Sequence, residues 1–365
     1  SKMACNGFRM KLLPAVVLCL LPSFLCVEPL VVRVWEHELH LIEKSISDDA
    51  FRALTSPIAA LVNQTYTATT GCSYFDPLHA NYVPEGWSRG NLTHDPPEGG
   101  MRALTFLHSD GLRGVLAFRG TDLDASSVSG QADACADELL WGNAEGSPPD
   151  YCSNFSNQTL DYWSRARDFW VQVQGAYPST QWLLSGHSLG AGLSVLLSME
   201  QCCSSALPST ASSCEVPSLV FSSPPVDQLL QARVENCSLP ALKARHWRSA
   251  LVLADSSDPV YHDASLAKGL NGTTDCLWVP DPVPEPCQLC FEATGSDDFE
   301  DKTLRACDVC MATSHVFGHY LGLVEKSPRP ECTFFRGADV GQQTGTSAGV
   351  MRQPLLSSKV AFASL

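Results

Sequence analysis

The pentapeptide Gly186-His187-Ser188-Leu189-Gly190 is the feature that most constrains the fold of this chain. An apolar run, Trp182-Leu183-Leu184-Ser185, precedes it, and small residues, Ala191-Gly192-Leu193-Ser194, follow it. This pattern predicts a strand, a tight turn and a helix that folds back against the strand. Such a turn needs glycines beside the serine, whose side chain then projects from the sheet. Chance matches to the pattern are common in a chain rich in glycine and serine, but the flanking segments favour a catalytic Ser188.

Composition indicates a globular protein with an acidic surface. The chain has 365 residues, of which 44% are hydrophobic and 17% are charged. This length allows one α/β domain of roughly 250–300 residues or two smaller ones. The formal net charge of −15 argues against a nucleic-acid partner and against avid binding to anionic lipid.

Residues 1–26 resemble a secretion signal. A short basic segment, Arg9-Met10-Lys11, precedes the apolar run Leu12–Leu25, which is too short to span a membrane easily. A membrane anchor is the alternative, but Pro14 and Pro22 also disfavour it. We expect a cleaved signal peptide, no stable membrane span, and a location outside the cell or in the lumen of a lysosome or vacuole.

Two further features favour export. Sixteen cysteines are more than an ordinary cytosolic enzyme carries, and they favour disulfides in an oxidising compartment. Six asparagines begin an N-x-S/T motif without proline at x, so we expect N-glycans at Asn63, Asn91, Asn154, Asn157, Asn236 and Asn271.

Short apolar runs alternate with helical patterns along most of the chain. Met101–Leu107 and 114–119, joined by a Ser-Asp-Gly turn, predict an antiparallel hairpin. Further buried strands are expected at 219–221 and 251–254, and another strand at 30–35 near the N-terminus. Strands that alternate with helices predict an α/β fold with a mostly parallel central sheet flanked by helices.

A serine hydroxyl becomes a useful nucleophile when a histidine accepts its proton and an acid orients that histidine. In a fold of this kind the acid and the base follow later strands, so the chain order should be Ser, Asp, His. The acid candidates lie just after the strand 251–254, and the base candidates lie beyond them: Asp255 and Asp258; His262, His315 and His319. His262 is close in sequence to Asp258, which makes it a poor candidate for a separate loop.

The motifs together resemble those of the class 3 (fungal-type) lipases, a family of the α/β-hydrolase superfamily. The resemblance spans roughly residues 60–325. The matching segments are Phe118-Arg119-Gly120-Thr121-Asp122, Gly186–Ala191, Phe221-Ser222-Ser223-Pro224-Pro225-Val226 (in which Ser222 and Pro225 depart from the pattern), Asp258-Pro259-Val260, and His315 with Tyr320-Leu321, where Phe317 replaces a leucine.

The resemblance implies a Ser-His-Asp triad of Ser188 as nucleophile, His315 as base and Asp258 as orienting acid, with His319 as an alternative base. The amide of Leu189 should supply one donor of the oxyanion hole. The family pattern places the second donor at Thr121, which could otherwise be a turn residue closing the hairpin.

The resemblance also implies an activity. We expect an α/β-hydrolase domain over residues 27–335, with a Cys-rich insert at 270–312 and a flexible tail at 336–365. It should be a secreted lipase that cleaves acyl esters of lipids at an interface, first of all triacylglycerol, and it needs no cofactor. A phospholipase A-type activity, a small-ester (feruloyl-like) esterase and a catalytically silent lipase-like binding protein are the alternatives.

Residues 123–158 lie where such lipases carry a lid. Leu139, Leu140 and Trp141 could form the apolar face of a lid that opens at a lipid surface. Alternatively, Cys135 and Cys152 could pin this segment as a glycosylated loop. The sequence leaves both interpretations open.

The insert contains two C-x-x-C pairs. Cys287-x-x-Cys290 and Cys307-x-x-Cys310 have a spacing typical of a zinc site, and a thiol redox pair is another possibility. Export favours disulfides instead. Such crosslinks would hold together the long excursion from Asp258 to His315.

Overall fold

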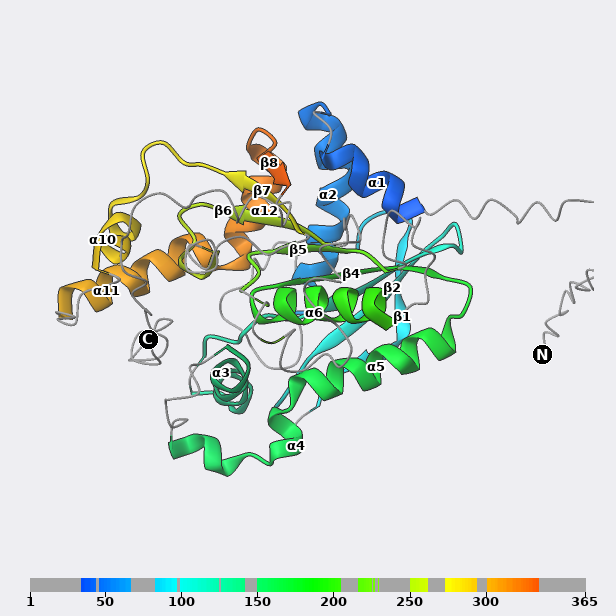
Figure 1. The fold of residues 1–365 in the computed structure, drawn as a ribbon, viewed down its shortest axis with the longest axis horizontal. Helices are drawn as coiled ribbons and strands as arrows, with labels where there is room; N and C mark the ends of the chain where they lie inside the picture. Colours follow the sequence, from blue (N-terminus) through cyan, green and yellow to red (C-terminus); the bar gives the residue numbers. More distant parts are fainter. Residues whose placement is uncertain are drawn as a thin grey trace, which may run out of the picture. The chain divides into compact units, whose positions relative to one another are not determined.

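A computed structural model describes residues 34–43, 46–66, 83–96, 99–124, 126–141, 150–204, 216–224, 226, 229, 250–261, 273–293 and 301–334 (Figure 1). The expected signal peptide, the expected tail 336–365, His262, Asn236 and Asn271 lie outside these residues.

Among the described residues, the centre of the fold is an eight-stranded sheet whose strands follow one another in sequence order (Figure 1). Strands β3 to β7 are parallel, whereas β1, β2 and β8 pair antiparallel with their neighbours. The expected α/β class with a mostly parallel sheet is thus confirmed. The strands are β1 Trp87–His94, β2 Ala103–His108, β3 Arg113–Phe118, β4 Gln181–His187, β5 Ser218–Phe221, β6 Ala250–Asp255, β7 Thr273–Trp278 and β8 Glu331–Phe334.

Helices cover both faces of the sheet (Figure 1). One hydrophobic core joins α3, α5 and α6 to the sheet, and a second joins α1, α2 and α12 to its other face. The helices are α1 Val34–Glu43, α2 Asp48–Asn63, α3 Val128–Trp141, α4 Asn157–Leu160, α5 Tyr162–Ala176, α6 Leu189–Ser204, α10 Glu285–Ala293, α11 Asp301–Cys310 and α12 Phe317–Lys326, with short turns η2 Asp150–Asn154 and η3 Met311–His315.

The parallel strands are apolar because both of their faces are covered. In β4, Leu184 packs in the core beneath α5 and α6, while its neighbour Leu183 packs in the core beneath α1 and α2. Successive side chains of a strand point to opposite faces, so a strand in the middle of such a sheet reads as a continuous apolar run. Because strands β3 to β7 are parallel, their carboxyl ends lie together at one edge of the sheet, where loops can meet.

The expected strand at 30–35 is wrong for the residues that the structure describes. Val34 and Trp35 begin helix α1, and residues 30–33 lie outside the described part. Trp35 is buried, and its indole N–H donates to the carbonyl of Gln181 at 2.8 Å. A short continuous apolar run shows neither the helical nor the strand period, so the sequence cannot distinguish the two. Here the packing of Trp35 favours a helix.

The expectation of a glycan at Asn63 is also wrong. Asn63 is the last residue of α2, and its side chain is fully buried. A glycan needs an exposed amide nitrogen, and the packing around α2 leaves no space for one. Asn91, Asn154 and Asn157 are exposed, so a glycan at each of them stays a prediction.

Disulfides rather than zinc occupy the twin C-x-x-C pairs. Cys287 bonds to Cys310 and Cys290 bonds to Cys307, so the two crosslinks join α10 to α11. The expected insert is partly sheet, because β7 lies within residues 270–312 and is crosslinked to β8 by Cys276–Cys332. Among the described residues, no cluster of side chains has the make-up of a metal site.

The segment 123–158, expected to be either a lid or a pinned loop, contains helix α3. A disulfide joins Cys135 of α3 to Cys152, as the pinned-loop interpretation predicted. Of the expected apolar face, Leu139 is exposed whereas Leu140 is buried. Residues 142–149 of this segment lie outside the described part.

None of the described helices is long and apolar enough to cross a membrane.

Candidate active site

Ser188 lies at the turn between β4 and α6. Its backbone φ of 54° falls in the left-handed region that non-glycine residues rarely adopt, so this turn is strained. The two glycines of the motif are required by contact: a Cβ on Gly186 would lie 2.5 Å from the Gly190 backbone, and one on Gly190 would lie 2.6 Å from the Arg119 carbonyl. The backbone N–H of Ser188 donates to the Phe221 carbonyl at 3.1 Å, which ties the turn to β5.

His315 lies between Ser188 and Asp258. Its Nε2 is 2.8 Å from the Ser188 Oγ, and its Nδ1 is 2.9 Å from each carboxylate oxygen of Asp258. All three side chains are buried, with exposed fractions of 7% for Ser188, 3% for His315 and 0% for Asp258. Three residues far apart in the sequence are thus brought within hydrogen-bond reach of one another.

The protonation state of Asp258 fixes the tautomer of His315. Burial alone would raise the pKa of Asp258, whereas the interaction with His315, through charge and a hydrogen bond, lowers it. Hydrogen bonds from Ser222 and Tyr320 act in the same direction, so the pKa of this carboxyl lies below its usual value. An ionised Asp258 can only accept, so Nδ1 of His315 is the donor in this contact, and in the neutral imidazole Nε2 is then the nitrogen that can accept from Ser188.

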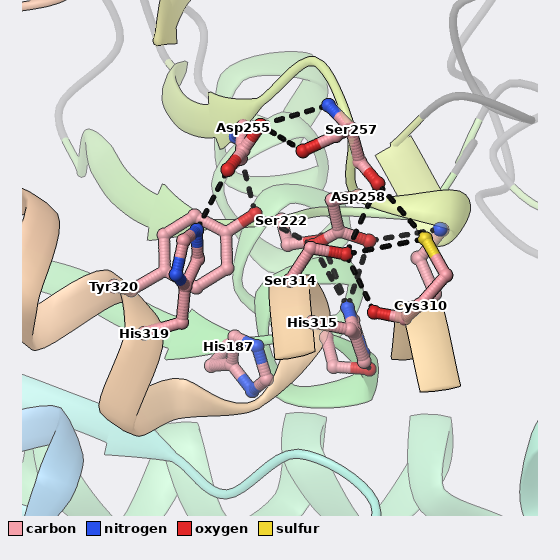
Figure 2. A network of polar contacts seen from close by, with 12 residues as sticks. His187, Ser222, Asp255, Ser257, Asp258, Cys310, Ser314, His315, His319 and Tyr320 are labelled. Carbon is pink, nitrogen blue, oxygen red and sulfur yellow. Dashed lines mark hydrogen bonds and ion pairs between the residues drawn. The ribbon is translucent and has the colours of Figure 1, made fainter. Parts of the chain in front are cut away.

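Tyr320 supports Asp258 from helix α12. Its hydroxyl donates to Asp258 Oδ2 at 2.6 Å and accepts the backbone N–H of Asp255 at 3.2 Å. The ring is fully buried, and Figure 2 shows its hydroxyl among the polar groups of Asp255 and Asp258. One hydroxyl therefore holds both the carboxylate and the end of strand β6, from which the Asp258 loop begins.

Ser222 stands where the family pattern has glycine, and the structure shows the reason for that glycine. The φ of Ser222 is 50°, a conformation that glycine adopts without strain. The substitution brings a hydroxyl into the site, 3.2 Å from Nδ1 of His315. Sequence comparison marked this position as a departure but did not predict the contact.

Asp255 and His319 form a second carboxylate–imidazole pair beside the first (Figure 2). Nε2 of His319 lies 2.6 Å from Asp255 Oδ2, and the other oxygen of Asp255 accepts from the backbone and hydroxyl of Ser257. His319 is thereby engaged away from Ser188. Of the two candidate bases that the structure describes, it is His315 that meets the serine.

Thr121 and Leu189 are the expected oxyanion donors: Leu189 directly follows Ser188, and Thr121 lines the same small pocket as His315. Helix α6 begins at Leu189, so its backbone N–H belongs to the first turn, where donors have no acceptor within the helix. The Thr121 hydroxyl donates to Asp137 Oδ2 at 2.6 Å. Burial raises the pKa of Asp137 to about 7, which the hydrogen bond from Thr121 only partly offsets.

Tyr66 and His187, which the sequence analysis did not select as site residues, connect the segment around Thr121 to His315. The Tyr66 hydroxyl accepts the backbone N–H of Gly120 at 3.0 Å and lies 2.7 Å from Nδ1 of His187. The His187 ring packs against His315, with their centroids 4.8 Å apart. Burial and the neighbouring His315 hold the pKa of His187 well below its usual value, so this ring is neutral. Tyr66 gave no signal in the sequence, because its partners lie far along the chain.

A buried ion pair joins helix α3 to the segment around Thr121. Arg119 Nη2 lies 2.6 Å from Asp133 Oδ2, and the same oxygen accepts the backbone N–H of Asp122 at 2.8 Å. Tyr162 donates to the other oxygen at 2.5 Å. Asp133 thus holds the Arg119 side chain before Thr121 and the Asp122 backbone after it. This role was also missing from the sequence-based prediction.

Searches for relatives found similar folds but no match in sequence. No family model and no curated protein matches the chain. Among solved structures, lipase II from Rhizopus niveus is 13% identical over 64% of this chain and 82% of its own, with a TM-score of 0.38. The native Rhizomucor miehei lipase propeptide complex is 18% identical over 65% and 71%, with a TM-score of 0.38. Lip2 lipase from Yarrowia lipolytica is 15% identical over 61% and 77%, with a TM-score of 0.33.

Each of these solved structures is that of a lipase. Similarity at this distance does not assign an activity to the chain. The function proposed below is therefore inferred from the geometry of the site.

Proposed function

We propose that this chain is a serine ester hydrolase of the lipase type, which cleaves acyl esters of lipids through an acyl-enzyme on Ser188. The observation that carries the proposal is the continuous hydrogen-bonded series from Ser188 through His315 to Asp258, with contacts of 2.8 and 2.9 Å. This order of groups is the one that activates a serine hydroxyl.

The proposed reaction begins when the Ser188 oxygen attacks the ester carbonyl carbon and His315 Nε2 takes its proton. The N–H groups of Leu189 and Thr121 stabilise the negative oxygen that develops, an effect typically worth ~3 kcal/mol per donor. His315 then gives its proton to the departing alcohol, which leaves the acyl group on Ser188. In the second half His315 activates a water molecule that releases the fatty acid.

Asp258 stays ionised during these steps and stabilises the protonated imidazole. The hydroxyl of Tyr320 and the Ser222 side chain help to keep it ionised in its buried position. A small pocket beside the base is lined in part by Leu123, Val316 and Phe317, which gives an apolar surface next to the reacting groups.

Triacylglycerol is the first substrate we propose, and the phospholipid acyl ester and small soluble esters are the alternatives. The protein would act at a lipid interface, after export to the outside of the cell or to a lysosomal or vacuolar lumen. The four disulfides among the described residues support such a compartment.

The test is to incubate the purified protein with a triacylglycerol, with phosphatidylcholine and with a short soluble ester, each below and above its aggregation point. We expect release of fatty acid, fastest from aggregated triacylglycerol, and its loss in Ser188→Ala. A Ser188→Ala variant that retained full activity would overturn the proposal. A protein that binds these lipids without hydrolysing any of them would favour the silent binding protein.

A further inference from the structure

The helical hairpin α10–α11 leads directly into the base of the triad. Helix α11 ends at Cys310, and a single turn of π-helix, η3, follows and ends at His315. Turns of π-helix are rare and often occur at functional sites. The position of His315 therefore depends on how firmly this irregular turn is held.

One crosslink of the hairpin touches the segments that carry both the acid and the base (Figure 2). The Sγ of Cys310 lies 3.3 Å from the carbonyl oxygen of Ser257, the residue immediately before Asp258. Because Cys310 is disulfide-bonded to Cys287, its sulfur has no hydrogen and this approach is a packing contact. The disulfide is fully buried, and Ser257 has an exposed fraction of 1%.

Ser314, the residue immediately before His315, supplies the hydrogen bond that the sulfur cannot. Its hydroxyl lies 3.0 Å from the Ser257 carbonyl oxygen and 2.7 Å from that of Cys310, and these acceptors share its proton. The same oxygen lies 3.4 Å from the Cys310 sulfur and 3.6 Å from the Cys287 sulfur. Ser314 is thus enclosed by the disulfide on one side and the Asp258 loop on the other.

We propose that the Cys287–Cys310 disulfide and the Ser314 hydroxyl form a clasp that holds Asp258 and His315 in register with each other. Ser314 and the two cysteines are positioning residues in this account, and they touch no substrate. The inference rests on the proposed function, since it concerns the acid and base of that reaction. The second crosslink, Cys290–Cys307, joins the two helices of the hairpin.

A clasp matters here because the backbone at Asp258 and at His315 lies outside regular secondary structure. Asp258 follows a turn at the end of β6, and His315 ends a π-helical turn, so neither is held by a regular hydrogen-bond ladder. The contacts at Ser257 and Ser314 act one residue before each catalytic group. A displacement of about 1 Å at reacting groups can cost about a hundredfold in rate.

The hairpin provides a matched pair of variants. Cys287→Ala with Cys310→Ala removes the clasp, and Cys290→Ala with Cys307→Ala removes the other crosslink. The two disulfides close loops of similar length, with sequence separations of 23 and 17, so both double variants should lose similar stability. Ser314→Ala is a third, milder variant that leaves both disulfides intact.

The experiment measures kcat and KM for a soluble ester, together with thermal unfolding, for the wild type and all three variants. We expect kcat to fall at least about tenfold without the clasp, with KM within about twofold of wild type, because the loss is in alignment of the reacting groups. Without the other crosslink, kcat should stay within about twofold of wild type. Ser314→Ala should lower kcat by an intermediate factor and lower the unfolding temperature by less than either double variant does.

The clasp is contradicted if both double variants lose kcat equally or if neither loses it. If removal of the clasp prevents folding, Ser314→Ala decides: a folded variant with wild-type kcat contradicts the proposal, and one with reduced kcat at unchanged KM supports it. A wild-type protein that hydrolyses no ester refutes the proposed function itself, which is a distinguishable result.

Discussion

Replacing Tyr320 with phenylalanine removes one hydroxyl and leaves the ring in place, so no cavity is created. That hydroxyl donates to the buried carboxylate of Asp258 at 2.6 Å and accepts the N–H of Asp255 at 3.2 Å. A hydrogen bond to a charged group contributes about 1.5–3 kcal/mol, and a buried donor left unpaired adds about 1 kcal/mol. We therefore expect the free energy of unfolding of Tyr320→Phe at pH 7 to fall by about 2–4 kcal/mol.

The loss should depend on pH in a definite direction. The pKa of Asp258 lies below its usual value, so its contribution to stability is present above the pKa of an unfolded aspartate and is lost as pH falls through the folded pKa. The deficit of Tyr320→Phe should then shrink as pH falls through the folded pKa of Asp258, toward about 2 kcal/mol for a neutral hydrogen bond and the unpaired N–H of Asp255. Urea unfolding at pH 7 and at a series of lower pH values, followed by tryptophan fluorescence, measures both quantities.

The matched control is Tyr261→Phe, which removes a hydroxyl that donates to the buried Asp275 at 2.9 Å. Its stability should also fall, by about 2 kcal/mol, but its kcat should stay near wild type, whereas Tyr320→Phe should lower kcat about tenfold. A Tyr320→Phe protein as stable as wild type at pH 7, or a control that loses kcat equally, would refute the role given to this hydroxyl.

Two further predictions concern the segment around Thr121. Gly120→Ala would place a Cβ 2.5 Å from the His187 carbonyl. We therefore expect it to lower the free energy of unfolding, measured by urea titration, by at least about 2 kcal/mol. A variant as stable as wild type would contradict the packing described. Because the pKa of Asp137 is raised to about 7, the folded state holds a proton that the unfolded state has lost above pH ~4, and wild-type stability should decline as pH rises from ~4 to ~7. Asp137→Asn lacks this decline, so its free energy of unfolding should rise by about 1–2 kcal/mol relative to wild type between pH 4.5 and pH 8. This is less than the full pKa shift would give, because the Asp137 side chain is partly exposed. Stability curves of the variant and the wild type that run parallel with pH would refute the assignment.

The parts of the site that the sequence predicted share one property: each belongs to a local pattern. Ser188 lies in a strand–turn–helix motif, and Asp258 follows a buried apolar strand, so the topology of a parallel sheet brings them to one edge. The twin C-x-x-C spacing brought the four cysteines to notice as a candidate zinc site, and it was the expected export of the chain that favoured disulfides there.

The parts that the sequence did not predict depend on contacts between distant segments. Tyr66 meets Gly120 and His187 only after helix α2 has packed on the sheet. Strand β1 has a mixed burial pattern and lies at the edge of the sheet, so its residues lack the apolar run of a central strand. The burial of Asn63 was missed for the same reason, since a glycosylation motif carries no information on packing.

The most direct test of the account is covalent labelling of the proposed nucleophile. The purified protein is treated with a fluorophosphonate, which forms a stable bond with an activated serine, and the modified residue is located by peptide mass spectrometry. The account predicts a single label on Ser188, no label in Ser188→Ala, and labelling slowed at least about a hundredfold in His315→Ala. Labelling at another residue, or labelling of Ser188 at an unchanged rate without the imidazole, would contradict it.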